Sequence, residues 1–185
     1  MRARLASGNP HKLDELRAAL PGWELELLET STAYPPEDGD TYEENARGKA
    51  VFGRAHAPAD EWVLGEDSGI EVAALGGGPG VISARYGGEG SGKARLLREL
   101  SGADDRLARY VCTIVALGPA GDEVVVVGTL EGAVADEQRG SEGFGYDPIF
   151  VPEGETRTVA ELGDAWKREH SHRARAAAAL AAALS

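Results

Sequence analysis

The segment WVLGEDSGI, residues 62–70, largely decides how this chain is interpreted. Its apolar start, Trp62 to Leu64, predicts a buried strand, and the adjacent carboxylates Glu66 and Asp67 follow at the carboxyl end of that strand. Open α/β sheets bind ligands at the carboxyl ends of their strands, and hard oxygen ligands of this kind suit Mg²⁺. The same Asp-Ser-Gly sequence is also typical of an ordinary turn that ends a strand. The rest of the chain must distinguish these two interpretations.

The composition predicts a folded globular protein with an acidic surface. A chain of 185 residues can bury a sizeable core in one domain. Its formal net charge of −12 argues against nucleic acid or an anionic membrane as the main partner, because both need a basic surface. A small polyanionic ligand is compatible with this charge if a metal ion and a few local cations neutralise it.

The cysteine content and the termini indicate a cytoplasmic protein. Cys112 is the single cysteine, which excludes an intrachain disulfide and a cysteine-based zinc site. We interpret it as a buried structural thiol because it lies in a strand-like run. Residues 1–5 lack the apolar stretch of a signal peptide, and the apolar segment 176–184 is too short to span a bilayer.

Strand and helix signals alternate without a dividing linker, which predicts one α/β domain over residues 1–185. The predicted strands lie at residues 2–7, around 25–27, and at about 108–117, 123–134 and 149–151, and a further strand containing Trp62 to Leu64 ends at Glu66. The predicted helices lie at residues 11–20, 41–56, about 93–100 and from about 158 onward. A capping box of Thr41 and Glu44 opens the second helix. The predicted loops are residues 31–40, 76–92 and a hairpin turn at 119–122.

The turn from Ser7 to Lys12 joins the first predicted strand to the first predicted helix. A glycine-containing turn of this kind presents backbone N–H groups and a helix amino terminus, which suit phosphate, and Lys12 adds a mobile positive charge. The alternative is a plain Asn-Pro helix start with a surface lysine, because the stretch is not the longer P-loop pattern.

Further charged residues surround the second predicted helix. Glu37 lies in a loop rich in proline and glycine, from which its carboxylate can point at a shared metal ion. Lys49 follows Asn45 by four residues and therefore shares its helix face. For residues 43–44 and Lys49 the alternative is a solvated helix face.

The carboxyl-terminal third offers groups that suit a nucleoside. The segment GFGYDP, residues 143–148, places aromatic rings between flexible glycines, where a base can stack on a ring. Lys167 and the stretch 171–173 place cations and hydrogen-bond donors near a helix start, with Ser171 as its N-cap. The alternatives are a turn with core-filling aromatics and a charged helix surface.

In this order the segments resemble the inosine triphosphate pyrophosphatase family, the Ham1-like pyrophosphatases of non-canonical purine nucleoside triphosphates. The matching stretches are SGNPHK at 7–12, EDGDTYEENARGKA at 37–50, EDSGI at 66–70, LGGGPGVISARYGG at 75–88, GFGYDPIF at 143–150 and SHR at 171–173. Each motif alone is weak evidence of the family, but the six occur in register and together are strongly specific. They cover the chain nearly end to end.

The resemblance implies an elongated, two-lobed α/β fold with a long central mixed β-sheet flanked by helices, an active-site cleft between the lobes, and a homodimer. It also implies Mg²⁺-dependent hydrolysis of dITP, ITP and XTP to the monophosphate and pyrophosphate. Such an enzyme removes deaminated purines from the nucleotide pool.

Carried over position by position, the resemblance assigns Asp67 as the proton acceptor and assigns Glu37 and Asp67 to the metal. The residues that it assigns to the substrate are Ser7, Gly8, Asn9, Pro10, His11, Lys12, Lys49 and Ser68 for the triphosphate, and Phe144, Gly145, Tyr146, Asp147, Lys167, His172 and Arg173 for the nucleoside. Donors from His172 and Arg173 suit the 6-oxo group of hypoxanthine or xanthine, whereas adenine carries an amino donor there. Two positions depart from the family pattern. Glu66 stands where aspartate is usual, and His170 stands where an apolar residue is more typical.

Two other functions remain open from the sequence alone. A Maf-like pyrophosphatase for another modified nucleotide would prefer dTTP or UTP to ITP. A non-catalytic nucleotide-binding module would keep its function when Asp67 is changed to asparagine.

Overall fold

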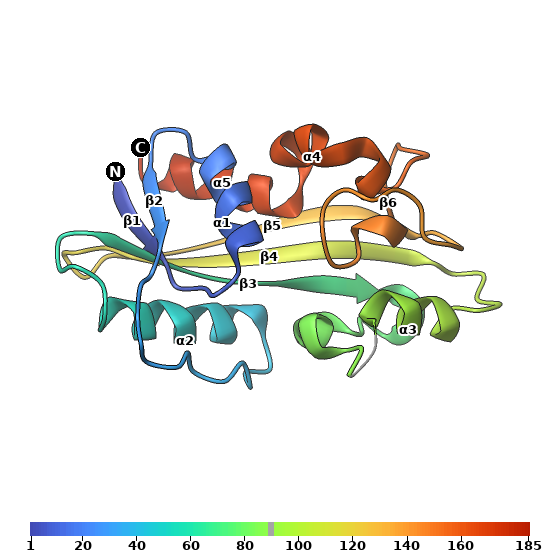
Figure 1. Ribbon diagram of the computed structural model, residues 1–185, viewed down its shortest axis with the longest axis horizontal. Coiled ribbons are helices and arrows are strands. Elements are labelled where there is room, and N and C mark those ends of the chain that lie inside the picture. The colour runs from blue at the N-terminus through green and yellow to red at the C-terminus, as the bar shows by residue number, and fades with distance from the viewer. Residues whose placement is uncertain (89–90) are drawn as a thin grey trace. The chain divides into compact units, whose positions relative to one another are not determined.

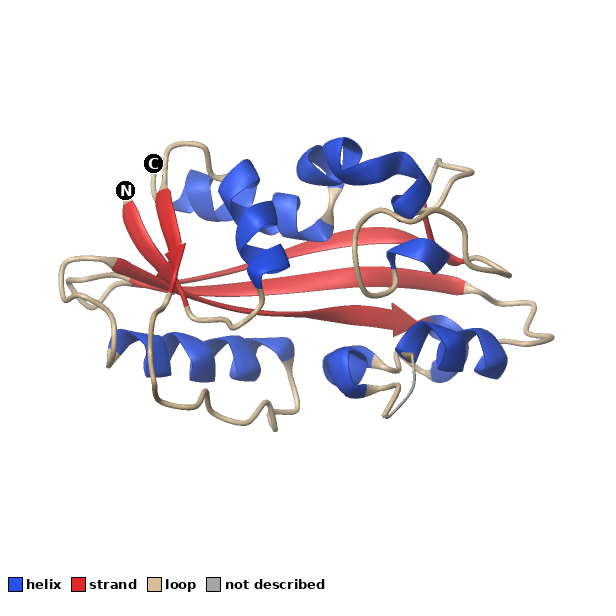
Figure 2. Ribbon diagram, viewed as in Figure 1, coloured by secondary structure: helices blue, strands red, loops and turns tan. Residues whose placement is uncertain are grey.

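The computed structural model describes residues 1–88 and 91–185, and its strands form one mixed sheet flanked by helices (Figure 2). The strands are β1 (Arg2–Leu5), β2 (Glu24–Leu27), β3 (Trp62–Val72), β4 (Leu107–Leu117), β5 (Glu123–Val134) and β6 (Phe150–Pro152). Their order in the sheet is β2-β1-β3-β4-β5-β6. The sheet is mixed, as the family resemblance implies, because β1 runs parallel to β2 and β3 while β6 runs antiparallel to β5.

The helices include three that begin at a side-chain cap, supplied by Asn9, Thr41 and Thr158. They are α1 (Pro10–Ala19), α2 (Tyr42–Arg54), α3 (Gly92–Glu99), α4 (Val159–His170) and α5 (His172–Ala183), with 3₁₀ helices η1 (Ala73–Leu75), η2 (Gly80–Arg85) and η3 (Asp147–Ile149). The predicted capping box of Thr41 and Glu44 is confirmed, and Thr158 with Glu161 forms a second one at α4. The predicted loop 76–92 contains η2, and its residues 89–90 lie outside the described part of the chain.

The chain folds into two compact units, each assembled from segments distant in sequence. The first unit comprises residues 1–67, 112–128 and 173–185, and the second comprises residues 68–111 and 129–172. Along the chain, β3, β4 and β5 each continue from a segment of one unit into a segment of the other. The single-domain organisation and the two-lobed arrangement with a cleft stay predictions.

Helices cover both faces of the strands in the first unit. Within it, α2 covers one face, while α1 and α5 cover the other (Figure 1). Its main core joins Leu5 of β1 and Leu64 of β3 to Leu16 of α1, Ala177 and Leu180, all fully buried. Because the last two residues belong to α5, the prediction that the alanine-rich end is a packing helix is confirmed.

The second unit has a core of its own. Within it, α3 lies on one side of the strands and α4 on the other (Figure 1). The core joins Ile70 and Val72 of β3 to Leu96 of α3, Phe150 of β6 and Val159 of α4.

The prediction that a strand ends at the acidic pair is wrong. β3 continues to Val72, so Glu66 and Asp67 lie in the middle of a strand rather than at its carboxyl end. The reason is that Ile70 and Val72 alternate along the strand and are both fully buried in the second core. This burial overrides the local turn preference of Asp-Ser-Gly.

Candidate active site

Glu66 and Asp67 are neighbours on β3, so their side chains point to opposite faces of the sheet. Glu66 contacts residues of α1 and α5, while Asp67 contacts residues of α2, which covers the other face of the first unit (Figure 1). Glu66 is 0 % exposed and Asp67 is 4 % exposed, so each carboxylate needs polar partners. The acidic pair therefore belongs to two separate polar clusters.

Asp67 forms hydrogen bonds with two side chains of α2. Asn45 Nδ2 donates to Asp67 Oδ2 at 3.1 Å, and Lys49 Nζ donates to Asp67 Oδ1 at 3.0 Å. Asn45 and Lys49 reach the strand from one helix face, as their spacing predicts. The helix approaches β3 closely because Gly65 has no side chain, and a Cβ there would lie 2.0 Å from the carbonyl oxygen of Ala46.

The same ammonium group also binds a second carboxylate. Lys49 Nζ donates to Glu37 Oε1 at 2.6 Å, and Lys49 is only 5 % exposed. The alternative of a solvated helix face is therefore wrong for Lys49, although residues 43–44 are exposed. The loop residue Glu37 and the strand residue Asp67 thus lie around one positive charge.

Burial and charge act in opposite directions in this cluster. Burial raises the pKa of Asp67, and the attraction of Lys49 and the hydrogen bond from Asn45 offset it only in part. Burial lowers the pKa of Lys49, but the negative charges of Asp67 and Glu37 outweigh burial and raise that pKa overall. The contact therefore outweighs the effect of burial on the charged form of Lys49 but not on the charged form of Asp67. Asp67 consequently has a higher proton affinity than an exposed aspartate.

Glu37 and Asp67 fit a magnesium ion by their donor chemistry. Both supply hard carboxylate oxygens, and both already contact the same cationic group. Mg²⁺ usually takes one or two carboxylates and completes its shell with water and substrate phosphate oxygens. Within residues 1–88 and 91–185, no group of three or more His, Cys, Asp or Glu side chains forms a metal site. Mg²⁺ at Glu37 and Asp67 stays a prediction that the donor set permits.

Cations on the other face of the strand hold Glu66. Lys12 Nζ lies 2.6 Å from Glu66 Oε2, while Arg173 Nη2 and Nε donate to Oε1 at 3.0 and 3.2 Å. The Cys112 thiol donates to the same oxygen at 3.3 Å, and Arg173 also pairs with Glu15. Sequence reasoning missed Glu15, although its spacing from Lys12 places both on one face of α1.

The charges of this cluster fix the ionisation of its members. Burial raises the pKa of Glu66, but the positive charges of Lys12 and Arg173 outweigh it and hold that pKa well below its ordinary value. Burial and the negative charge of Glu66 raise the pKa of the Cys112 thiol well above its ordinary value. Cys112 is buried, as predicted. Arg173 is 1 % exposed, and its guanidinium, which the resemblance assigns to the base, lies against Glu66 and Glu15.

The turn before α1 is a capped helix start that borders open space. Asn9 Oδ1 accepts from the His11 N–H at 3.0 Å, and Ser7 Oγ accepts from the Asn9 N–H at 3.1 Å. A Cβ on Gly8 would meet no atom within 4 Å. A pocket of about 690 Å³ in the first unit is lined in part by Ser7 and Gly8. This turn is therefore accessible to a ligand, and its binding of phosphate stays a prediction.

Asp147 connects the predicted nucleoside-binding residues of the second unit. Its Oδ2 accepts from the Phe144 N–H at 2.8 Å and from Lys167 Nζ at 2.6 Å, and this ammonium lies 4.1 Å from the centre of the Phe144 ring. Lys167 is buried, so the alternative of a charged helix surface is wrong for it. Gly143 has φ of 74°, and a Cβ there would lie 2.2 Å from Asp147 Oδ2, so the turn requires glycine.

Two tyrosines support this segment. Tyr146 is buried and donates to the Ser83 carbonyl at 2.8 Å, which matches the alternative of a core-filling aromatic. Tyr110 on β4 stacks on His172 with 4.7 Å between ring centres, and its hydroxyl donates to Asp147 Oδ1 at 3.3 Å. Sequence reasoning missed these contacts of Tyr110, because a strand pattern shows which residues are buried but not which distant side chains they meet.

The predicted site residues therefore form two groups, each within one unit. Those of the first unit are Ser7, Gly8, Asn9, Pro10, His11, Lys12, Glu37, Lys49, Asp67 and Arg173; those of the second are Ser68, Phe144, Gly145, Tyr146, Asp147, Lys167 and His172.

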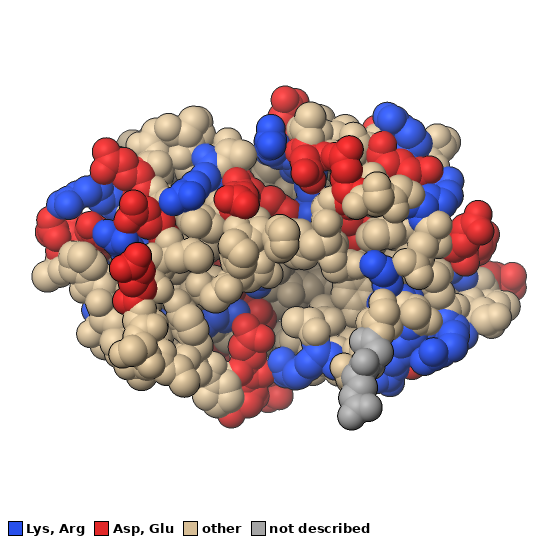
Figure 3. All heavy atoms as spheres, viewed as in Figure 1, with Lys and Arg blue, Asp and Glu red and all other residues tan. Residues whose placement is uncertain are grey.

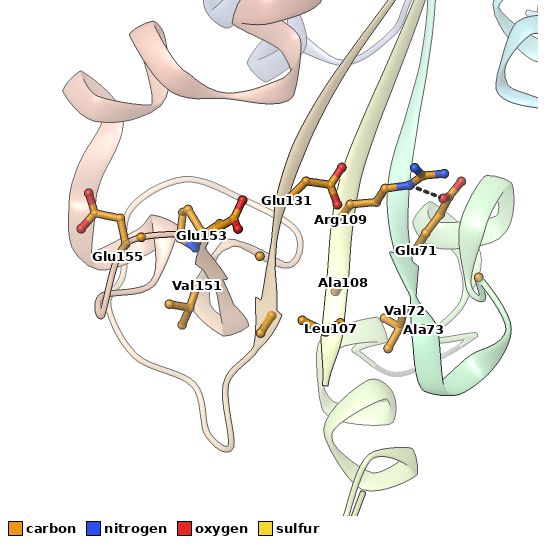
Figure 4. Close-up of a pocket in the computed structure, with 15 residues that line it drawn as sticks. Glu71, Val72, Ala73, Leu107, Ala108, Arg109, Glu131, Val151, Glu153 and Glu155 are labelled. Carbon is orange, nitrogen blue, oxygen red and sulfur yellow. Dashed lines mark hydrogen bonds and ion pairs between the residues drawn. The ribbon is translucent and has the colours of Figure 1, made fainter. Parts of the chain in front are cut away.

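A separate pocket of about 600 Å³ lies in the second unit (Figure 4). Its apolar lining includes Val72, Leu107 and Val151, and an ion pair of Arg109 Nε with Glu71 Oε2 at 2.7 Å lies beside it. None of the predicted site residues is among the described residues that line this pocket.

The surface carries mixed charge. On the face that Figure 3 shows, Lys and Arg side chains are interspersed with Asp and Glu side chains over much of the surface, and several Lys and Arg side chains lie together at the lower right. That nucleic acid is not a partner stays a prediction, which rests on the net charge of −12. Among the described residues, no helix combines the length and the apolar character needed to cross a membrane.

Comparison with known proteins gives consistent matches over the full chain. The model of the Ham1 family matches residues 3–183. A dITP/XTP pyrophosphatase of Opitutus terrae is 46 % identical, covering 98 % of this chain and 97 % of the relative. A dITP/XTP pyrophosphatase of Bdellovibrio bacteriovorus is 43 % identical, covering 93 % of this chain and 92 % of the relative.

Solved structures of similar proteins have the same fold. The Ham1 protein of Staphylococcus aureus superposes with a TM-score of 0.86 at 36 % identity, covering 100 % of this chain and 98 % of that one. A nucleoside-triphosphatase (dITP/XTP pyrophosphatase) of Mycobacterium abscessus superposes with a TM-score of 0.77 at 40 % identity, covering 100 % of both chains.

Proposed function

Because the chain belongs to the Ham1 family, we propose that it is a Mg²⁺-dependent nucleoside triphosphate pyrophosphatase. Its substrates are dITP, ITP and XTP, which it hydrolyses to the monophosphate and pyrophosphate. In this role the enzyme removes deaminated purines from the nucleotide pool of the cytoplasm, and it works as a homodimer. The relatives named dITP/XTP pyrophosphatase support the substrate class.

The observation that carries this proposal is the convergence of Glu37 and Asp67 on one ammonium. Lys49 Nζ lies 2.6 Å from Glu37 Oε1 and 3.0 Å from Asp67 Oδ1. Two carboxylates and a lysine in contact form a set that can hold a metal ion and an outer phosphate together. When bound, Mg²⁺ neutralises negative charge on the leaving pyrophosphate.

Asp67 has the features of the proton acceptor. In the reaction, the oxygen of a water molecule bonds to the α phosphorus, and the bond from that phosphorus to the α–β bridging oxygen breaks. The bonding pair leaves with pyrophosphate, and Asp67 takes a proton from the water. Burial raises the pKa of Asp67, which brings it closer to the pH at which a general base works best. Asn45 and Lys49 fix the orientation of the carboxylate from α2.

The remaining site residues bind the substrate. The turn Ser7–Lys12, with Lys49 and Ser68, binds the triphosphate, for which open space beside Gly8 gives support. The residues Phe144–Asp147, Lys167 and His172 bind the nucleoside. His172 donates to the 6-oxo group of the base and rejects adenine, whose amino group is itself a donor. The resemblance assigns Arg173 the same role. Its pairing with Glu66 and Glu15 makes His172 the donor on which we place the selectivity.

A substrate panel tests this function directly. Purified protein is incubated with Mg²⁺ and with dITP, ITP, XTP, dATP, dTTP or UTP in turn, and released pyrophosphate and orthophosphate are measured separately. We expect pyrophosphate from the first three nucleotides and much less from dATP. Turnover of dTTP or UTP in preference to dITP would instead identify a pyrophosphatase for another modified nucleotide.

A further inference from the structure

Tyr110 is a buried residue of β4 that contacts two of the residues proposed to bind the nucleoside. Its ring packs against the rings of Phe150 and His172, with 4.2 and 4.7 Å between ring centres and angles of 28° and 27° between ring planes. Its hydroxyl donates to Asp147 Oδ1 at 3.3 Å. Since only 5 % of Tyr110 is exposed, it contacts these residues from within the core of the second unit.

The stack controls the orientation of His172. An imidazole can select a base only if its N–H points at the acceptor, because hydrogen bonds weaken steeply when they are bent. A near-parallel contact with the Tyr110 ring restricts rotation of the imidazole about its χ2 angle. The plane in which His172 can donate is therefore set by Tyr110.

The hydroxyl of Tyr110 acts on a second residue. Asp147 Oδ2 accepts from the Phe144 N–H and from Lys167 Nζ, and Tyr110 supplies a donor to the other oxygen, Oδ1. Donors on both oxygens fix the rotation of the carboxylate, and Asp147 in turn holds the Phe144 backbone and the Lys167 ammonium. Tyr110 thereby steadies the segment 144–147 as well as His172.

We propose that Tyr110 is a positioning residue that sets the preference for 6-oxo over 6-amino purine nucleotides by orienting His172 and Asp147 together. The inference rests on the proposed function, and it extends selectivity to a core residue that is not itself in the set of substrate-binding residues. Tyr110 contacts His172 and Asp147, which we assign to the nucleoside rather than to the triphosphate, so its loss should change base selection more than phosphate chemistry.

The test compares Tyr110→Phe and Tyr110→Leu with the wild-type protein. The quantity measured is the ratio of kcat/KM for dITP to kcat/KM for dATP, with Mg²⁺ present. Tyr110→Phe keeps the ring and removes only the hydroxyl, so we expect the ratio to fall about fivefold, the effect of one hydrogen bond. Tyr110→Leu also removes the stack, so we expect a fall of about twentyfold. The fall should come from dITP, with kcat/KM for dATP changing little.

Tyr86→Phe is the matched control, because Tyr86 lies in the same core cluster and its hydroxyl donates to the carboxylate of Glu99. We expect Tyr86→Phe to keep the wild-type ratio. A wild-type ratio in Tyr110→Phe, or an equal fall in Tyr86→Phe, would overturn the inference. If Tyr110→Leu fails to fold, the ratio measured for Tyr110→Phe alone tests the inference.

A double-variant measurement separates positioning from general loss of structure. If Tyr110 acts through His172, then His172→Ala and Tyr110→Leu together should lower the ratio by less than the product of their separate effects. If the double variant lowers the ratio by the full product of the two separate effects, the inference is contradicted. A wild-type protein that releases no pyrophosphate from dITP would refute the proposed function instead, so the two failures are distinguishable.

Discussion

Replacing Glu66 with glutamine should destabilise the protein strongly at neutral pH. The carboxylate is fully buried, with Lys12 Nζ at 2.6 Å and Arg173 Nη2 at 3.0 Å, so the substitution leaves two cations facing a neutral amide. Removing one partner of a buried ion pair costs about 3–5 kcal/mol, and we expect the lower end because glutamine retains an oxygen acceptor. A loss of about 3 kcal/mol lowers the Tm of a chain of this size by roughly 9 °C.

The pH dependence of this loss has a definite sign. The pKa of folded Glu66 lies well below its ordinary value of 4.5, so its ionisation stabilises the fold fully above that pH. The contribution disappears as the pH falls below 4.5 and through the folded-state pKa. The free-energy difference between wild type and Glu66→Gln should therefore be largest at neutral pH and shrink in acid.

Urea unfolding of both proteins at several pH values measures this difference. Glu123→Gln is the control, because Glu123 pairs with Arg47 at the surface of the same unit and both side chains are substantially exposed. We expect Glu123→Gln to cost under about 1 kcal/mol at every pH. The reasoning about the buried cluster would be refuted if Glu66→Gln cost no more than Glu123→Gln at neutral pH, or if its cost grew as the pH fell.

Two further substitutions test the nucleoside-binding residues of the second unit. His172→Ala should lower the ratio of kcat/KM for ITP to kcat/KM for ATP by about tenfold or more, because it removes the proposed donor to the 6-oxo group. The Kd of the nucleoside triphosphate should change little. Equal losses of kcat/KM for ITP and ATP would contradict that role. Gly143→Ala should lower stability by about 1–3 kcal/mol and raise the KM for dITP, because it forces a side chain into φ of 74° and against Asp147 Oδ2. Gly145→Ala is its control, since φ there is also positive but a Cβ would meet nothing within 4 Å. Thermal melts and kinetics that fail to separate Gly143→Ala from Gly145→Ala would show that contact with Asp147 is unimportant.

Much of the fold follows from local sequence signals. The capping box at Thr41 and the leucines of α1 locate two helices, and the alternating fold class follows from the order of the elements. The turn between β4 and β5 is also where proline and glycine predict it, with the Gly118 N–H donating to the Asp122 carbonyl at 2.8 Å. In each case the information lies within a few residues of the feature.

The features that the sequence did not reveal depend on long-range contacts. The extension of β3 past Asp67 depends on the burial of Ile70 in a second core, which overrides a local turn signal. The burial of Lys49 depends on Glu37 and Asp67, which approach it from a loop and a strand. The spacing within α2 predicted that Lys49 shares a helix face with Asn45. No local pattern indicates that two carboxylates contact the Lys49 ammonium on that face.

The pairing of Glu66 with Arg173 is a stronger example of the same limit. Arg173 lies 107 positions along the chain from Glu66, and its motif gave no sign that the guanidinium contacts this strand. The family resemblance assigned residues to the candidate site, an assignment that stays a prediction, and the contacts of these residues follow only from the fold. Asp67 and Glu66, adjacent in sequence, consequently have different environments and different pKa shifts.

Pyrophosphate release from dITP by the wild-type protein and by Asp67→Asn, each with Mg²⁺, tests the central proposal most directly. We expect the wild type to form one pyrophosphate per dITP consumed and Asp67→Asn to lose about 10²-fold or more in kcat, because a general base contributes at least that much. The variant should still bind dITP. It should also be no less stable than the wild type at neutral pH, since a carboxyl whose pKa burial raises opposes folding when it is ionised. Near-wild-type turnover by a folded Asp67→Asn, or orthophosphate as the product of the wild type, would contradict Asp67-dependent cleavage between the α and β phosphates.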